Sequence, residues 1–199
     1  YIYVSLSFTD TFAIDNVLMT TNEYSDVAVM KLDPSGNVLW AKRAGGELSD
    51  MPWKVAVDYE GSVYLTGGFR GDIDLGGTLS ESSSTSWTAF LIKYSAAGNL
   101  VWFKRAVGGL SIGRDILADG YGNIICVGEF AGNPEFGSAM LANDGGYDAY
   151  LIHFDTDGTV IYSESSMGSG TEYIMSITQS GLGPVIVTGF FQDTLTLGT

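Results

Sequence analysis

Short runs of alternating hydrophobic and polar residues follow one another along the chain, and the same order of runs returns about every 61 residues. Phe8, Phe69, Phe130 and Phe191 stand in register and mark this period. The runs are of strand length and rich in β-branched and aromatic residues, so each predicts a β-strand. A fixed period of this size indicates a stacked or radial repeat architecture.

Four strands are predicted in each repeat. The clearest copies of one strand are Asp26–Leu32, Thr88–Tyr94 and Asp148–Phe154. The other three predicted strands are represented by the runs around Val38–Trp40, Val55–Val57 and Val63–Gly67. Four antiparallel strands per repeat are typical of a propeller blade. The fold class is therefore predicted to be all-β, a β-propeller segment of about three 61-residue repeats.

Four-residue turns that end in glycine separate the strands. Asp33–Gly36, Asp58–Gly61 and Asp119–Gly122 are examples. An Asp at the first position and a Gly at the last favour a type I turn followed by a left-handed residue. Gly67, at the end of its strand, is predicted to lie where neighbouring backbones crowd together.

The repeat divides residues 1–199 into one propeller segment with two complete units and two partial ones. The units are 1–44 (partial), 45–106, 107–166 and 167–199 (partial). About 3.3 periods are fewer than the roughly four to eight blades that close a propeller ring. We therefore expect a piece of a longer chain, with remaining blades or a partner chain completing the ring.

The runs Lys31–Lys42, Ala56–Gly67 and Asp74–Gly77 resemble the bacterial SBBP β-propeller repeat, and the strand order is similar to that of NHL-type propellers. The resemblance implies a secreted or cell-surface bacterial protein, and no established catalytic residues. It also implies that the strand at Val55–Val57 is innermost and that of Trp40 outermost. The insertions and the glycine-rich loops would then share one face, and the tight turns would lie on the other.

Composition narrows the function classes. The chain is 45% hydrophobic and carries a net charge of −14, which excludes disorder caused by low hydrophobicity and disfavours nucleic-acid partners. No apolar run approaches the roughly 20 residues of a membrane span. Cys126 lies in an apolar run and is expected to be a buried, unreactive thiol.

Two sets of carboxylates are candidate calcium ligands, and no other cofactor is expected. Asp155 and Asp157 lie together in a turn, although the aligned turns favour a plain hairpin. Asp50 and Glu172 align with each other and are predicted to lie where loops pass the propeller axis. A solvated acidic rim is the competing interpretation for the second pair.

A ligand-binding face is predicted on the insertion side of the sheets. The residues assigned to it are Asp72, Asp74, Trp87, Glu135 and Tyr147. By contrast, the single histidine, His153, aligns with Lys31 and Lys93, which favours a structural role over catalysis.

The predicted function is that of a non-enzymatic scaffold. It would present loops for protein or glycan binding on a bacterial surface, in some settings within a larger envelope assembly. The alternative is a propeller enzyme of the lyase, glycosidase or quinoprotein type, with catalytic residues partly outside this chain. An acid–base pair converging at the axis would favour the enzyme.

Overall fold

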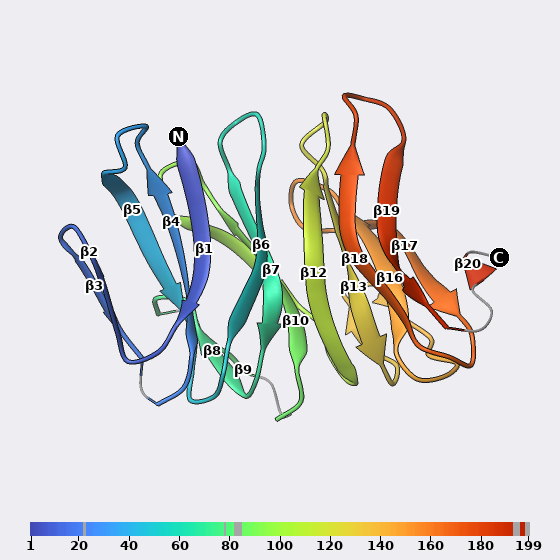
Figure 1. Ribbon diagram of the computed structural model, residues 1–199. Helices are drawn as coiled ribbons and strands as arrows, with labels where there is room; N and C mark the ends of the chain where they lie inside the picture. The colour runs from blue at the N-terminus through green and yellow to red at the C-terminus, as the bar shows by residue number, and fades with distance from the viewer. Residues whose placement is uncertain (22, 78, 82–84, 193–195, 198–199) are drawn as a thin grey trace.

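The computed structural model (Figure 1) describes residues 1–21, 23–77, 79–81, 85–192 and 196–197. Over these residues the chain consists of β-strands, turns and loops, with no helix and therefore none that could cross a membrane. Every described strand pair is antiparallel. The prediction of an all-β chain built from antiparallel sheets is confirmed.

Four larger sheets follow one another along the chain. Sheet 1 contains β1 (Ile2–Phe8), β4 (Asp26–Leu32) and β5 (Val38–Ala44). Sheet 2 contains β6 (Met51–Val57), β7 (Val63–Phe69), β10 (Thr88–Tyr94) and β11 (Leu100–Arg105). Sheet 3 contains β12 (Leu110–Ala118), β13 (Ile124–Ala131), β16 (Asp148–Phe154) and β17 (Val160–Met167). Sheet 4 contains β18 (Glu172–Gln179) and β19 (Val185–Phe191).

A small hairpin is inserted between the second and third repeat strands. The three described hairpins are β2 (Thr11–Ile14) with β3 (Val17–Thr20), β8 (Asp72–Asp74) with β9 (Leu79–Glu81), and β14 (Glu135–Phe136) with β15 (Ala139–Met140). Each of the last two hairpins also bridges to the preceding sheet, through Asp74 to Gly45 and through Glu135 to Val107. The short strand β20 (Thr196–Leu197) pairs with β17 at the equivalent place. The insertions therefore fasten each sheet to the one before it.

The strand order within the complete sheets agrees with the predicted order. In sheet 2 the order is β11-β10-β7-β6, which places β6 at one edge and β11, with Trp102, at the other. The first strands of sheets 2, 3 and 4 are β6, β12 and β18, and β12 contacts both of the others. We call these three the inner strands.

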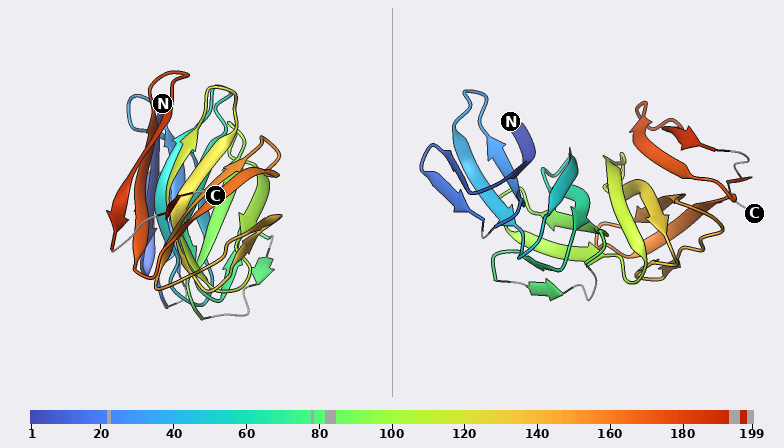
Figure 2. Two further views of the ribbon diagram at one scale, coloured as in Figure 1. Left: turned by 90° about the vertical axis from the view of Figure 1, so that its right-hand side faces the viewer. Right: turned by 60° about the horizontal axis from the view of Figure 1, so that its bottom comes forward.

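Figure 1 shows the sheets standing face to face, with the β6–β7 and β12–β13 turns at the top and the β8–β9 hairpin at the bottom. We call the top the turn end and the bottom the hairpin end. The right-hand view of Figure 2 shows that the sheets follow an arc. As predicted, tight turns and insertions lie at opposite ends of the sheets.

The hydrophobic core lies between the sheets. Val29, Leu65 and Phe90 are buried between sheets 1 and 2, and Tyr64 and Tyr150 between sheets 2 and 3. A middle strand is covered on both faces and needs apolar side chains on both, so every residue of β7 is buried. This double burial explains why such strands read as continuous hydrophobic runs.

Outer-strand tryptophans hold neighbouring sheets together. The indole N–H of Trp40 donates to the Ala96 carbonyl oxygen at 3.2 Å, and that of Trp102 donates to Thr156 at 3.0 Å. Each carbonyl belongs to a turn of the next sheet and also accepts a hydrogen bond from a lysine, Lys31 or Lys93. These tryptophans therefore pack and orient the following turn.

The aspartates of the tight turns cap their own backbone. Asp58 Oδ1 accepts hydrogen bonds from the N–H groups of Glu60 and Ser62, at 2.9 and 2.8 Å. The final Gly61 has φ +80°, a left-handed conformation that glycine adopts without strain. The predicted type of turn is confirmed here, and the turns beginning at Asp33, Asp119 and Asp155 repeat the same contacts.

Candidate functional site

The inner strands extend farther toward the hairpin end than the sequence predicts. The pattern predicted this strand of the repeat around Val55–Val57, whereas β6 begins at Met51. The equivalent strand of the next repeat, β12, begins at Leu110. Each inner strand contains a register shift, at Trp53, Arg114 and Met175 respectively. Such a β-bulge breaks the alternation of side chains, which hid the first half of each strand.

The three bulged residues form a row across sheets 2, 3 and 4. A bulge changes the direction in which its side chain points. The three bulged positions are 61 residues apart, so the same change recurs in each repeat. The Arg114 guanidinium lies over the Trp53 ring, 4.4 Å from its centroid, and Met175 lies beside Arg114 in a common hollow. Trp53 and Met175 are 46% and 48% exposed. Their repeat spacing is the signal that could have identified this row in the sequence.

The hollow beside this row has a volume of about 440 Å³ and is open to solvent. We call it the inner-strand groove. Its walls come from β12, β13 and β18 and from the residues that immediately precede β10 and β16. The lining residues are Trp87, Leu110, Ile112, Arg114, Glu129, Tyr147, Tyr173 and Met175.

Aromatic rings line one part of the groove and extend beyond it. Tyr147 and Tyr173 are in contact, with ring centroids 6.0 Å apart, and Tyr173 stacks on Phe190 at 6.1 Å. Trp87 lies against Gly68, where a side chain would crowd the ring, and the Arg70 guanidinium lies 5.8 Å from the Trp87 ring centroid. Partly exposed rings of this kind are typical of binding surfaces.

The two charged groups that line the groove are paired with each other. Glu129 is buried, and both of its carboxylate oxygens accept hydrogen bonds from Nε and Nη2 of Arg114. A bidentate pair fixes the orientation of the guanidinium. Arg114 is thus held between a carboxylate and the Trp53 ring.

Two of the five residues predicted for the ligand-binding face line this groove, and three do not. Trp87 and Tyr147 lie in it. Asp72 and Asp74 belong to β8, and Glu135 to β14. The backbones of Asp74 and Glu135 pair with the preceding sheet, so these residues lie beside the ends of the outer strands.

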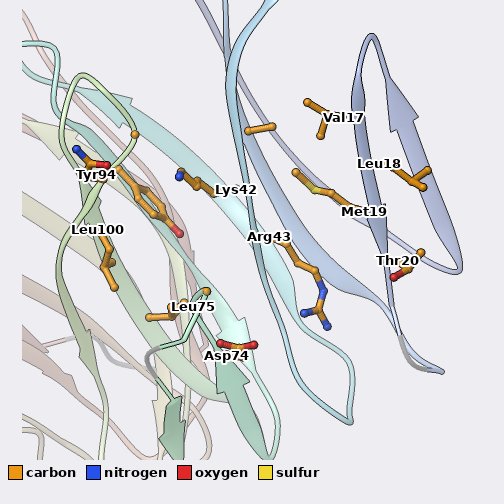
Figure 3. Close-up of a pocket in the computed structure, with 14 residues that line it drawn as sticks. Val17, Leu18, Met19, Thr20, Lys42, Arg43, Asp74, Leu75, Tyr94 and Leu100 are labelled. Carbon is orange, nitrogen blue, oxygen red and sulfur yellow. The ribbon is translucent and has the colours of Figure 1, made fainter.

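Asp74 instead lines a larger cleft, of about 600 Å³, between sheets 1 and 2 (Figure 3). Lys42, Arg43, Leu75 and Tyr94 also border it. A smaller cleft of about 250 Å³, lined by the aligned residues of the next repeat, lies between sheets 2 and 3. Because a cleft recurs at the same position between successive sheets, we attribute it to the packing of the sheets.

The candidate calcium ligands do not gather into a metal-binding cluster in the described part of the chain. Asp155 caps the turn between β16 and β17, where its carboxylate accepts hydrogen bonds from the N–H groups of Asp157 and Thr159. Asp50 and Glu172 lie at different sheet junctions. Within the described ranges, no group of three or more His, Cys, Asp or Glu side chains could hold a metal ion.

Asp50 and Glu172 are buried, so the interpretation of this pair as a solvated acidic rim is wrong. They are buried because their backbone N–H groups form hydrogen bonds that join neighbouring sheets. The N–H of Asp50 donates to the carbonyl oxygen of Ser25 at 2.7 Å, and the N–H of Glu172 donates to that of Tyr147 at 2.7 Å. Ser111 makes the same bond at the junction between sheets 2 and 3.

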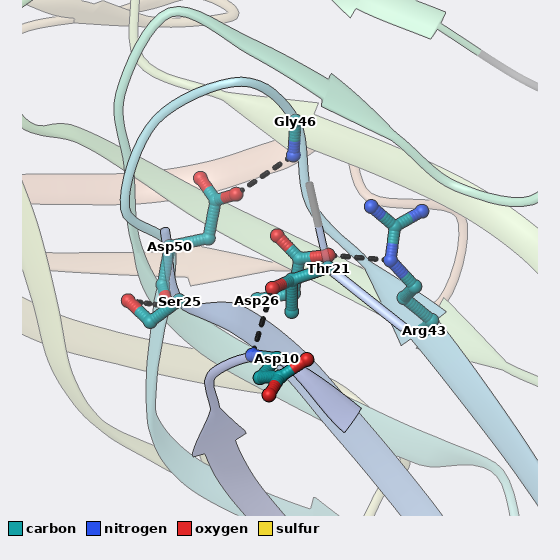
Figure 4. Close-up of polar contacts among 7 residues, drawn as sticks. All are labelled: Asp10, Thr21, Ser25, Asp26, Arg43, Gly46 and Asp50. Atoms are coloured by element: carbon teal, nitrogen blue, oxygen red, sulfur yellow. Dashed lines mark hydrogen bonds and ion pairs between the residues drawn. The ribbon is translucent and has the colours of Figure 1, made fainter. Parts of the chain in front are cut away.

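Asp50 and Asp26 are two buried carboxyl groups near each other at the junction of sheets 1 and 2 (Figure 4). Asp50 Oδ2 accepts a hydrogen bond from the Gly46 N–H at 2.9 Å, while Arg43 pairs with Asp26. Burial raises the pKa of Asp50 to about 7, and the nearby Asp26 charge adds to this effect. Burial also raises the pKa of Asp26, despite the Arg43 charge.

This arrangement predicts that the free energy of unfolding falls as the pH rises from about 4 to about 7. The folded chain holds a proton on Asp50 in this range, whereas the unfolded chain releases it. We expect a loss of about 2 kcal/mol, since water entering the junction would relieve part of the cost.

Asp50→Asn should remove most of this pH dependence, measured by urea unfolding at a series of pH values. Glu47→Gln, an exposed position in the same loop, should leave it unchanged. An unaltered profile in Asp50→Asn would show that another group is responsible.

Cys126 and His153, for which the sequence predicted structural roles, each contact residues of the fold. Cys126 is buried against Thr66 and Tyr150, and burial raises the pKa of its thiol to about 11. His153 Nε2 lies 3.5 Å from Asp119 Oδ2, at the turn between β12 and β13.

Comparisons with known proteins give partial matches. No family model matches the chain. It is 25% identical over 142 residues to "Uncharacterized WD repeat-containing protein L264" of Acanthamoeba polyphaga mimivirus, a match that covers 63% of this chain and 10% of that protein. It is 34% identical over 138 residues to "Regulatory protein FlaEY" of Caulobacter vibrioides, covering 67% of this chain and 14% of that protein. The chain therefore spans a small part of each relative.

Proposed function

We propose that this chain is a β-propeller-like binding scaffold that holds a segment of a partner protein in the inner-strand groove. The sheets act as blades, and the groove crosses the inner strands of sheets 3 and 4. The observation that carries the proposal is the groove itself, with its three partly exposed aromatic rings and the row of bulged residues beside it.

Three features support a propeller-like arrangement. The repeat produces consecutive sheets with the same strand order, and these sheets contact one another along their inner strands. They follow an arc. One of the similar proteins is named for WD repeats, which form propeller blades of four strands. We further propose, on the sequence resemblance alone, that the repeats are of the SBBP type in a secreted or cell-surface bacterial protein.

The groove favours a protein segment over a glycan. Leu110, Ile112 and Met175 give it aliphatic walls between the aromatic rings. A sugar needs many hydrogen-bond partners, but Arg114 and Glu129 are already bonded to each other. Apolar side chains of a peptide gain affinity from such walls without leaving these polar groups unpaired.

The same pairing disfavours the enzyme alternative for this groove. General acid–base catalysis needs a carboxyl group within reach of the proton that it transfers. Glu129 is the carboxyl group of the groove, and it is buried and held by Arg114. We therefore assign the groove to binding.

A selection with a phage library of random dodecapeptides tests this function. We expect enriched peptides to be rich in aromatic and aliphatic residues. The double substitution Tyr147→Ala/Tyr173→Ala should weaken their binding by about tenfold or more, because buried aromatic contacts dominate such interfaces. Binding is measured by calorimetry with the synthesised peptides.

The matched control is Tyr24→Ala/Tyr162→Ala, which removes two exposed rings outside the groove. It should leave peptide affinity within about twofold of the parent. Equal losses in both variants, or no peptide enriched over the Tyr147→Ala/Tyr173→Ala protein, would contradict the proposal. Binding to a defined oligosaccharide panel that depends on Tyr147 and Tyr173 would assign the groove to glycans instead.

A further inference from the structure

A second hollow lies at the opposite end of the sheets from the groove. It has a volume of about 440 Å³ and is formed where three tight turns of sheets 2 and 3 meet. These are the β6–β7 and β12–β13 turns, at the top of Figure 1, and the β16–β17 turn. Its lining includes Tyr59, Glu60, Lys93, Tyr121, Thr156 and Asp157.

Two tyrosines border this hollow with their rings largely in water. Tyr59 is 84% exposed and Tyr121 is 75% exposed. Neither ring is needed to form its turn, since Asp58 and Gly61 fix the first turn and Asp119 and Gly122 the second. Exposed rings that add nothing to local structure are available for binding.

Two carboxylates of the hollow are also uncommitted. Within the described part of the chain, the Glu60 and Asp157 side chains make no hydrogen bond or ion pair. The ammonium group of Lys93, which also borders the hollow, already has partners. Lys93 Nζ donates to the Thr156 carbonyl oxygen at 2.9 Å and lies 5.2 Å from the centroid of the Tyr64 ring.

We propose that this turn-end hollow binds a basic segment of a partner, placing an arginine or lysine side chain between the two tyrosine rings and the two carboxylates. The faces of aromatic rings attract cations, and free carboxylates complete the charge. The net charge of −14 attracts a basic segment and repels an acidic one. The turn-end hollow shares no lining residue with the inner-strand groove. Binding at the hollow therefore does not depend on the function proposed for the groove.

Fluorescence anisotropy with a labelled hexa-arginine peptide tests this site. At about 0.1 M salt, charges beyond about 10 Å are screened, so binding then depends on local contacts. Glu60→Gln/Asp157→Asn should weaken binding by about fivefold or more. Tyr59→Ala/Tyr121→Ala, which changes no charge, should weaken it by about threefold or more.

The matched control is Glu23→Gln/Glu47→Gln, which removes the same charge from exposed positions outside this hollow. It should change the affinity by less than about twofold. An equal loss in both charge variants would show non-specific attraction to the acidic chain and would overturn the proposal. So would an unchanged affinity in Tyr59→Ala/Tyr121→Ala. Circular dichroism of each variant identifies any that fails to fold, and for such a variant Tyr59→Leu or Glu60→Gln alone replaces the double substitution.

Discussion

Replacing Gly128 by alanine is expected to lower the free energy of unfolding by roughly 4 kcal/mol or more. Gly128 lies in β13, where it pairs with Gly113 of β12. A β-carbon there would meet the backbone carbonyl oxygen of Ile112 and come within 2.9 Å of the Tyr150 ring. Backbone cannot move aside as a flexible side chain can, so the two strands would have to separate. Thermal and urea unfolding measure the loss.

Gly68→Ala is the control for this prediction. The added β-carbon would face the edge of the Trp87 ring at 3.0 Å, and that ring borders the open groove. We expect a cost of about 1 kcal/mol or less, because the ring can shift. The same substitution at Gly67 or Gly189 is a second test. A β-carbon at these positions would meet the carbonyl oxygens of Met51 and Tyr173 in the same way. If Gly128→Ala costs no more than Gly68→Ala, the crowding between strands does not constrain the fold.

The second large effect is expected at Arg114. Replacing it with leucine should destabilise the chain by about 3 kcal/mol, because Glu129 would remain buried without its partner. Substitution of both members, Arg114→Leu/Glu129→Met, should recover most of the loss, since apolar residues need no partner. Urea unfolding of the parent, the two single variants and the double variant gives the coupling energy directly.

A double variant as unstable as Arg114→Leu would contradict this account. It would mean that the loss comes from the contact of Arg114 with Trp53, not from an unpaired carboxylate. Lys54→Leu is a useful comparison. It removes a half-exposed lysine from its ion pair with Asp115, and Asp115 keeps hydrogen bonds from Ser176 and Ile177. That change should therefore cost less than about 1 kcal/mol.

The sequence predicted those parts of the molecule in which local pattern and structure agree. The strand Asp26–Leu32 and its two copies have the predicted bounds. The turn at Asp58 follows from Asp and Gly at fixed positions. Likewise, its apolar neighbours placed Cys126 correctly in a buried strand. In each case the residues that decide the structure are neighbours in the chain.

Prediction of the candidate site was partial for a physical reason. Trp87 and Tyr147 were assigned to a binding face and do line the groove, but Asp72 and Glu135 were grouped with them because all lie near insertions. An insertion can point toward the inner or the outer edge of a sheet. The direction of the insertion depends on how its backbone pairs with the preceding sheet, and this pairing joins residues far apart in the chain.

By itself, then, the sequence determined the repeat, the strands, the tight turns and the burial of the strand that contains Cys126, since each depends on side-chain pattern over a few residues. Only the tertiary structure decided the bulges that aim Trp53, Arg114 and Met175 along one row. It also decided the burial of Asp50, whose position at a sheet junction brings it beside Asp26. A bulge breaks the local alternation, and a junction joins residues of different repeats, so neither leaves a pattern in any short stretch of sequence.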